Sequence, residues 1–193
     1  MDLKVLRCLL LAPPGAGKGT QGNRIAALYG VPHISTGDVL REEVAAHTSI
    51  GREAAAFVSG GKLVPDEVVM TIVLERIATL KEPVGFVLDG FPRTIAQATE
   101  AYAWGDALGL TFQAVIALHV PQRVLLERVV RRGERSGRVD DTPDTLRRRL
   151  QVYAATSEPL FDFYRRRRIL LEVDGTGTVD EVTDRIRSRS MIN

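Results

Sequence analysis

The chain has 193 residues, of which 45% are hydrophobic and 26% are charged, and its formal net charge is only +2. This composition predicts one globular domain whose core needs no disulfide or metal, and the small net charge does not indicate a nucleic-acid partner. The single cysteine, Cys8, excludes an internal disulfide, and the sequence has no Cys/His set with zinc-ligand spacing. No stretch has the length of a membrane span or the pattern of a signal peptide, so we expect a cytoplasmic protein without a membrane partner.

Strand and helix signals alternate along the chain. Strands are predicted at residues 5–11, 32–35, 85–89, 114–120 and 169–173, and helices at 18–30, 38–48, 52–59, 66–80, 94–108, 123–132, 143–164 and 179–189. Continuous apolar strands that alternate with helices predict an α/β fold, a five-stranded parallel sheet with helices on both faces. Residues 35–65 and 131–141 interrupt this alternation, and we expect them to form small mobile pieces over a site at the carboxyl ends of the strands.

A glycine-rich turn, residues 14–20 (PGAGKGT), directly follows the first apolar strand. Glycines let several backbone N–H groups converge on one anion, and the helix N-terminus adds its positive dipole end. Lys18 supplies a point charge that can reach the outer phosphates of a nucleoside triphosphate. The match to Gly-x-x-x-x-Gly-Lys-Ser/Thr is imperfect, because Ala12 stands at the first glycine and Gly19 separates Lys18 from Thr20. We interpret the segment as a phosphate-binding loop of the P-loop NTPase type; the alternative is an ordinary Gly/Pro turn.

The arginines are unevenly distributed and gather within residues 128–149 and 165–168. The four consecutive arginines of the second group are interpreted as a solvated surface. The first group is interpreted as the lining of a cavity that neutralises phosphates, and the alternative is a set of surface ion pairs. Of the histidines, His119 is predicted to be a core residue, and His33 and His47 are predicted to lie on the surface.

Four further motifs accompany the phosphate loop: ISTGDVLR at 34–41, GKLVPD at 61–66, LDGFPR at 88–93 with Gln97, and RGERSGRVDD at 132–141 with Arg149. In this order and spacing, the chain resembles the adenylate kinases across essentially its whole length. The resemblance implies a monomer that reversibly transfers the terminal phosphoryl group of ATP, bound with Mg²⁺, to AMP and so gives two ADP. It also implies a core of residues 1–34, 65–130 and 142–193, a nucleoside-monophosphate-binding (NMP-binding) segment at 35–64, and a short lid at 131–141 without zinc.

The resemblance assigns a role to each matching residue. Binding of ATP is assigned to Gly15, Ala16, Gly17, Lys18, Gly19, Thr20, Arg132 and Gly177. Binding of AMP is assigned to Thr36, Arg41, Lys62, Leu63, Val64, Gly90, Phe91, Pro92, Arg93, Gln97, Arg138 and Arg149. Catalysis of the transfer is assigned to Lys18, Arg93, Arg128, Arg132, Arg138 and Arg149, and contact with magnesium, through water and the ATP phosphates, to Thr20 and Asp89. For Asp89 the alternative is a helix N-cap, and for Gly177 it is a plain strand-to-helix turn.

These assignments fit the chemistry of phosphoryl transfer. The AMP phosphate is already an anionic nucleophile, so the reaction needs alignment and charge stabilisation rather than a general base. Arginine suits that task, because its planar fork binds phosphate oxygens bidentately and keeps its proton. Related pyrimidine-nucleotide kinases usually carry alanine and asparagine near positions 36 and 94, whereas this chain has Thr36 and Thr94, which favours AMP. A UMP/CMP kinase, or a nucleotide-binding protein that has lost transfer, remains the alternative.

Ala12 is the one departure from the family pattern in the phosphate loop. If the backbone there requires φ > 0, alanine costs on the order of 1 kcal/mol relative to glycine. If φ is negative, the methyl group only crowds the phosphates slightly. We expect activity to survive, because Gly15, Gly17 and Gly19 remain.

Overall fold

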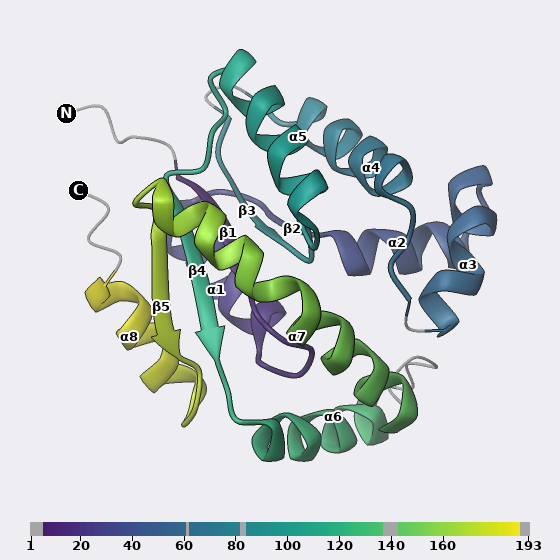
Figure 1. Cartoon of the computed structure of the whole chain (residues 1–193), viewed down its shortest axis with the longest axis vertical. Helices are drawn as coiled ribbons and strands as arrows, with labels where there is room; N and C mark the ends of the chain where they lie inside the picture. The colour runs from purple at the N-terminus through teal and green to yellow at the C-terminus, as the bar shows by residue number, and fades with distance from the viewer. Residues whose placement is uncertain (1–5, 61, 82–83, 137–142, 190–193) are drawn as a thin grey trace.

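Five short apolar segments form one parallel sheet in the order β2-β3-β1-β4-β5 (Figure 1). The computed structural model describes residues 6–60, 62–81, 84–136 and 143–189. The strands are β1 (Arg7–Leu11), β2 (His33–Ser35), β3 (Phe86–Asp89), β4 (Ala114–His119) and β5 (Leu170–Asp174). Within the described part, the five predicted strands and their parallel pairing are confirmed.

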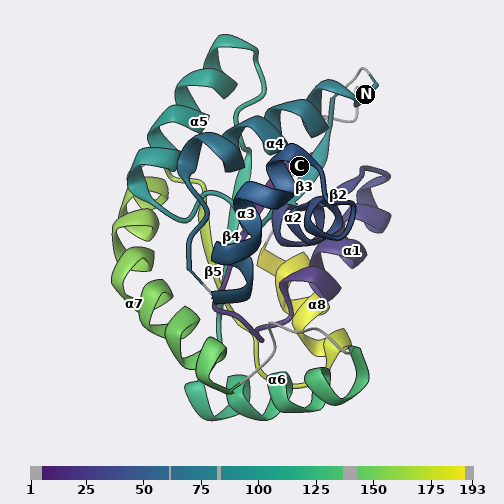
Figure 2. The ribbon, with the colours of Figure 1, turned by 90° about the vertical axis from the view of Figure 1, so that its right-hand side faces the viewer.

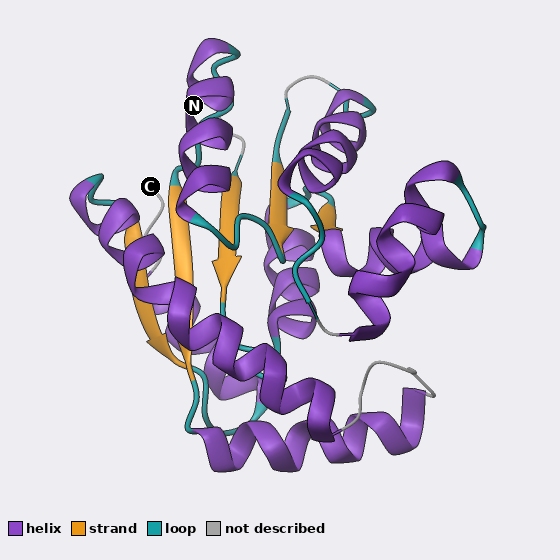
Figure 3. Cartoon of the chain, turned by 45° about the vertical axis from the view of Figure 1, so that its right-hand side comes forward, coloured by secondary structure: helices purple, strands orange, loops and turns teal. Residues whose placement is uncertain are grey.

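Eight helices of the described residues surround this sheet. They are α1 (Lys18–Tyr29), α2 (Thr36–Ala45), α3 (Ser49–Gly60), α4 (Asp66–Ala78), α5 (Ile95–Ala107), α6 (Gln122–Ser136), α7 (Pro143–Arg166) and α8 (Val179–Arg189). Seen at 90° to Figure 1, α5 and α7 lie to one side of the strands and α1 and α8 to the other (Figure 2). Helices α2 and α3 project from the sheet as a pair (Figure 3). No helix in the described ranges has the length and apolarity that a bilayer crossing requires.

The two faces of the sheet are buried in two separate apolar cores, which explains why β1 is a continuous apolar run. Successive side chains of a strand point to opposite faces. Leu9 and Leu11 pack with residues of α4, α5 and α7. Cys8 and Leu10 pack on the other face with residues of α1, α6 and α8. Burial raises the pKa of the Cys8 thiol to about 12, so this cysteine is an inert core side chain.

Two predictions about element limits and exposure were wrong. Helix α6 continues past residue 132 to Ser136, so the predicted lid at 131–141 begins inside a helix. Residues 131–136 (RRGERS) contain one poor helix former, Gly133. Glycine costs about 1 kcal/mol relative to alanine inside a helix, which is too little to end a helix of 15 residues. His119 is not a core residue: it ends β4 with its ring 5.6 Å from that of Phe161 of α7, yet 48% of its side chain is exposed and its Nε2 atom lies 2.9 Å from Glu172 Oε2.

Candidate active site

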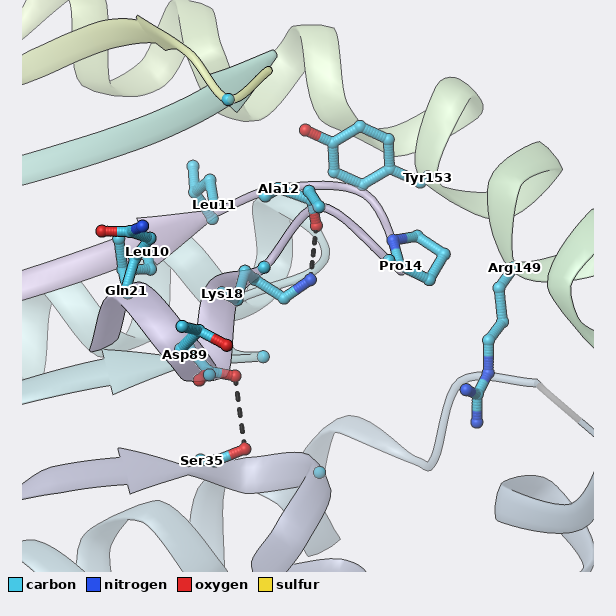
Figure 4. Close-up of a pocket in the computed structure, with 18 of the residues that line it drawn as sticks. Leu10, Leu11, Ala12, Pro14, Lys18, Gln21, Ser35, Asp89, Arg149 and Tyr153 are labelled. Carbon is cyan, nitrogen blue, oxygen red and sulfur yellow. Dashed lines mark hydrogen bonds between the residues drawn. The ribbon is translucent and has the colours of Figure 1, made fainter. Parts of the chain in front are cut away.

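A cleft of about 730 Å³ opens at the carboxyl ends of the central strands, between the phosphate loop and helices α2 and α7 (Figure 4). This is the position at which parallel α/β sheets bind their ligands. Most of the predicted site residues line it. They are Gly15, Ala16, Gly17, Lys18, Gly19, Thr20, Arg41, Leu63, Asp89, Gly90, Pro92, Arg93, Arg128, Arg149 and Gly177.

The phosphate loop joins β1 to α1 with backbone angles that two of its glycines allow. Gly15 and Gly17 have φ of +85° and +98°, a region that residues with a Cβ rarely adopt. Gly17 is the N-cap of α1 and supplies no side-chain cap, so the first N–H groups of the helix are available to an anion. Lys18 Nζ donates to the carbonyls of Ala12 at 2.7 Å and Pro13 at 3.1 Å. The ammonium group is therefore held against the loop, on the cleft side (Figure 4).

Ala12 is unstrained in this loop. Among the described residues other than glycine, positive φ occurs only at His47 and Arg168, so the conformation that would penalise alanine does not arise at position 12. The Ala12 methyl is instead part of the core beside Leu10 and Ala16, and the residue is 6% exposed. Of the two possibilities for this departure, the structure supports negative φ.

Replacing Ala12 by glycine should therefore leave phosphoryl transfer nearly unchanged. We expect kcat and the KM for ATP within about threefold of the natural protein, and a loss of roughly 0.5–1 kcal/mol in the free energy of unfolding, because glycine gains entropy in the unfolded chain. Steady-state kinetics and urea denaturation check both numbers. A gain in kcat of many orders of magnitude would show instead that alanine impairs the natural loop.

Asp89 ends β3 beside the phosphate loop and is 5% exposed. Its carboxylate accepts a hydrogen bond from Ser35 Oγ at 3.3 Å (Figure 4) and lies 2.7 Å from His33 Nε2. It does not cap a helix, because the N-cap of the following helix α5 is Thr94. Asp89 is thus a buried carboxylate, fixed on one side by β2 and facing the cleft on the other.

His33 is a site residue that the sequence reasoning missed. The prediction that His33 lies on the surface was wrong, because its side chain is only 9% exposed. Its Nδ1 atom lies 2.9 Å from Asn23 Oδ1. A Cβ on Gly22 would lie 2.4 Å from His33 Nε2, so the absence of a side chain at position 22 makes room for the ring. The sequence held one signal for this role of His33. It lies two residues before Ser35 in the same predicted strand, and this spacing places both side chains on one face of the sheet, next to β3.

Three arginines from different parts of the fold face this cleft: Arg41 from α2, Arg93 from the β3–α5 loop and Arg149 from α7. Arg93 Nε donates to Gly90 O at 2.7 Å. Although Arg93 remains accessible from the cleft, burial among protein atoms lowers the pKa of its guanidinium below the ordinary value, the charges of Arg149 and Arg41 lower it further, and Asp89 opposes them. The three cations repel one another, and an anion with several oxygens, such as a phosphate, relieves that repulsion.

Arg128 joins two loops of the cleft. Its guanidinium donates to Ala16 O at 3.2 Å in the phosphate loop, and to Gly175 O at 3.1 Å and Gly177 O at 3.3 Å between β5 and α8. It is therefore not one of the surface ion pairs considered as an alternative, because its partners are backbone carbonyls. Gly177, with φ of +92°, takes part in this bridge through its carbonyl oxygen.

The remaining predicted residues do not line the cleft. Thr36 and Gln97 are 1% and 2% exposed, and Thr36 Oγ1 donates to Asp89 O at 3.1 Å. Val64 and Phe91 are also buried, and Lys62 is exposed outside the cleft lining. Arg138 and the side chain of Arg132 lie outside the described residues. Among the described residues, the structure thus brings together those predicted to bind phosphate, and it buries Thr36 and Gln97, which were predicted to bind AMP.

The donor groups fit a magnesium ion that arrives with a nucleotide. Within the described ranges, no group of three or more His, Cys, Asp or Glu side chains could enclose a metal. Asp89 and Thr20 both line the cleft next to the phosphate loop. Mg²⁺ commonly binds through one or two carboxylates, water and substrate phosphates rather than in an all-protein cage, and this cleft offers that arrangement.

Comparisons with known proteins agree with the geometry. The family model described as adenylate kinase matches residues 10–169. The chain is 43% identical over 182 residues to the adenylate kinase of Xanthomonas oryzae pv. oryzae (strain MAFF 311018), which covers 94% of this chain and 97% of that protein. It is 45% identical over 181 residues to the adenylate kinase of Xylella fastidiosa (strain 9a5c), with the same coverage. It is also 43% identical over 182 residues to the adenylate kinase of Porphyromonas gingivalis (strain ATCC 33277), covering 94% of each chain. The chain therefore belongs to the adenylate kinase family.

Proposed function

We propose that the protein catalyses the reversible reaction of ATP, bound with magnesium, and AMP to give two ADP. The observation that carries this proposal is a cleft with two phosphate-binding sets. The loop with Lys18 lies on one side, and Arg41, Arg93 and Arg149 converge from three separate elements on the other. An enzyme that only hydrolysed ATP would have no use for the second set. We further propose that the enzyme is a monomer, as the resemblance to the adenylate kinases implies.

In this mechanism the protein aligns two anions and neutralises the charge between them. The loop N–H groups and Lys18 hold the phosphates of ATP, while Arg41 and Arg93 hold the AMP phosphate. Arg149, on α7, contacts the transferred group and stabilises its charge in the transition state. The AMP phosphate oxygen attacks the terminal phosphorus of ATP as the bond to the leaving ADP oxygen breaks, and no general base is required.

Asp89 and Thr20 would hold the magnesium ion through water and the ATP phosphates. When bound, the ion adds positive charge to those phosphates. His33 and Ser35 fix the orientation of the Asp89 carboxylate, with contacts of 2.7 Å and 3.3 Å, so this side chain loses little freedom when the nucleotide arrives.

We also propose that residues 35–64 and the lid at 131–141 close over the two nucleotides and exclude water. Helices α2 and α3, which belong to the first of these segments, project from the sheet (Figure 3). The burial of Thr36 and Gln97 fits the proposal, because a base could reach them only after the wall of the cleft moves.

A coupled assay that offers AMP, UMP, CMP and GMP separately, each with ATP and magnesium, tests the function. We expect kcat/KM for AMP to exceed that for each other acceptor by at least about 100-fold, because a buried hydrogen-bonding site rejects a base that leaves its polar groups unpaired. A preference for a pyrimidine nucleotide would identify a UMP/CMP kinase instead. Absence of turnover with every acceptor would leave a nucleotide-binding protein without transferase activity.

A further inference from the structure

The side-chain amide of Gln97 is held at both ends by partners of opposite hydrogen-bonding type. Its Oε1 atom accepts from the backbone N–H of Arg93 at 2.7 Å, and its Nε2 atom donates to Asp66 Oδ1 at 2.6 Å. A backbone N–H can only donate and a carboxylate oxygen accepts. A reversed amide would therefore place its NH₂ against the N–H and its oxygen against the carboxylate. Because Gln97 is only 2% exposed, water could not compensate for either contact.

Asp66 is itself fixed by the start of two helices. It is the first residue of α4, where the positive end of the helix dipole favours a carboxylate. Its second oxygen, Oδ2, accepts from Thr94 Oγ1 at 3.3 Å. Thr94 in turn caps α5 by accepting from the Gln97 N–H at 3.1 Å. Asp66, Thr94 and Gln97 thus form a closed set of contacts that joins the first turns of α4 and α5.

We infer that Asp66 is a specificity-determining residue that acts through Gln97, because it fixes which end of the buried amide donates and which accepts. This inference rests on the proposed function, in which Gln97 meets the base of AMP. While the Gln97 amide keeps its contacts with Asp66 and Arg93, it has one further N–H and one further oxygen lone pair with which it can bind the base. These match adenine, which offers an acceptor at N1 and an amino group at C6. Hypoxanthine and guanine present an N1–H and a C6 carbonyl, and they would require the reversed amide.

Asp66 thus acts as a positioning residue, and IMP is the probe that isolates its effect. IMP differs from AMP only at N1 and the C6 substituent, so the ratio of kcat/KM for AMP to that for IMP reports the amide orientation. In Asp66→Asn, the new NH₂ group can donate to the Gln97 oxygen, so residue 66 no longer opposes the reversed amide and only the Arg93 N–H still does. We expect the AMP/IMP ratio to fall at least about tenfold, mainly through the KM for the monophosphate, while the KM for ATP stays unchanged.

Two matched single variants and one double variant separate this positioning role from a purely structural one. Glu67→Gln neutralises the neighbouring, exposed carboxylate of the same helix turn and should keep the natural ratio. Asp66→Glu retains an acceptor-only side chain and should keep most of the ratio. If Asp66→Asn does not fold, Asp66→Ser, whose hydroxyl can donate as well as accept, is the test variant and should also lower the ratio. In a Gln97→Ala background, Asp66→Asn should leave the ratio unchanged, because the residue through which Asp66 acts is gone.

The outcomes distinguish this inference from the proposed function. Equal losses with AMP and IMP in Asp66→Asn, or an unchanged ratio, would overturn the role of Asp66 while leaving the enzyme an adenylate kinase. A further change of the ratio in the Gln97→Ala background would also overturn it. Failure of the natural protein to use AMP would instead remove the proposed function, on which the inference depends.

Discussion

Replacement of Lys18 by methionine should lower kcat for the conversion of ATP and AMP to ADP by at least about 1,000-fold, because we propose that the ammonium group stabilises charge on the transferred phosphoryl group. Methionine has a similar length and no charge. The Lys18 ammonium contacts the Ala12 and Pro13 carbonyls at 2.7 and 3.1 Å, so its position is set before the nucleotide binds. The loop N–H groups remain in the variant, and we expect ATP affinity to fall much less than kcat.

Single-turnover kinetics and equilibrium binding of a fluorescent ATP analogue would separate these two effects. Lys81→Met is the matched control, because Lys81 is exposed and does not line the cleft, and it should retain full activity. Loss of less than about tenfold in kcat for Lys18→Met would contradict the proposed role, since charge-stabilising groups at phosphoryl-transfer sites contribute far more.

Arg149→Ala should reduce kcat/KM by roughly 1,000-fold, because in the proposed mechanism Arg149 reaches the phosphates from α7, and alanine supplies no charge in its place. The same helix supplies the control. Arg147 forms an exposed ion pair with Asp144 at 2.8 Å, one helical turn away, and such pairs contribute little. Arg147→Ala should therefore stay within about twofold of the natural protein.

Arg149→Lys adds a further readout. Lysine keeps the charge without the planar fork that binds two oxygens at once, so we expect this variant to recover only part of the lost activity. If Arg147→Ala and Arg149→Ala lost activity equally, the effect would come from the net charge of α7, and the assignment of Arg149 to the phosphates would be wrong.

The parts of this fold that follow local patterns could be predicted from the sequence. The apolar run of β1 indicated a strand buried on both faces, and the glycines after it indicated a loop that wraps an anion. Asp89 could be placed at the cleft because it ends a strand at that edge of the sheet, whereas the arginines were assigned to it through the resemblance of their motifs to those of the adenylate kinases. Ala12 could not be judged in advance, because the sign of φ depends on the loop path, which the sequence motif does not state.

What escaped prediction depends on contacts between distant segments. His33 looked like a surface residue because its burial comes from Asp89, 56 positions later. His119 looked like a core residue because it ends an apolar strand, yet beside Phe161 of α7 and Glu172 of β5 nearly half of its side chain stays exposed. The contact of Asp66 with Gln97 spans 31 positions and requires α4 and α5 to begin side by side. No periodicity within one segment reports such pairings.

The close fit between Gly22 and His33 has a consequence for protein engineering. Three atoms of the imidazole lie within 2.4–2.9 Å of the point where a methyl group on residue 22 would stand. A mutant library that varies position 22 alone should therefore return only glycine, whereas one that varies 22 and 33 together can exchange the ring for a smaller group. Any such exchange removes the neighbour that steadies Asp89, so a redesign of this corner has to treat helix, strand and carboxylate as one unit.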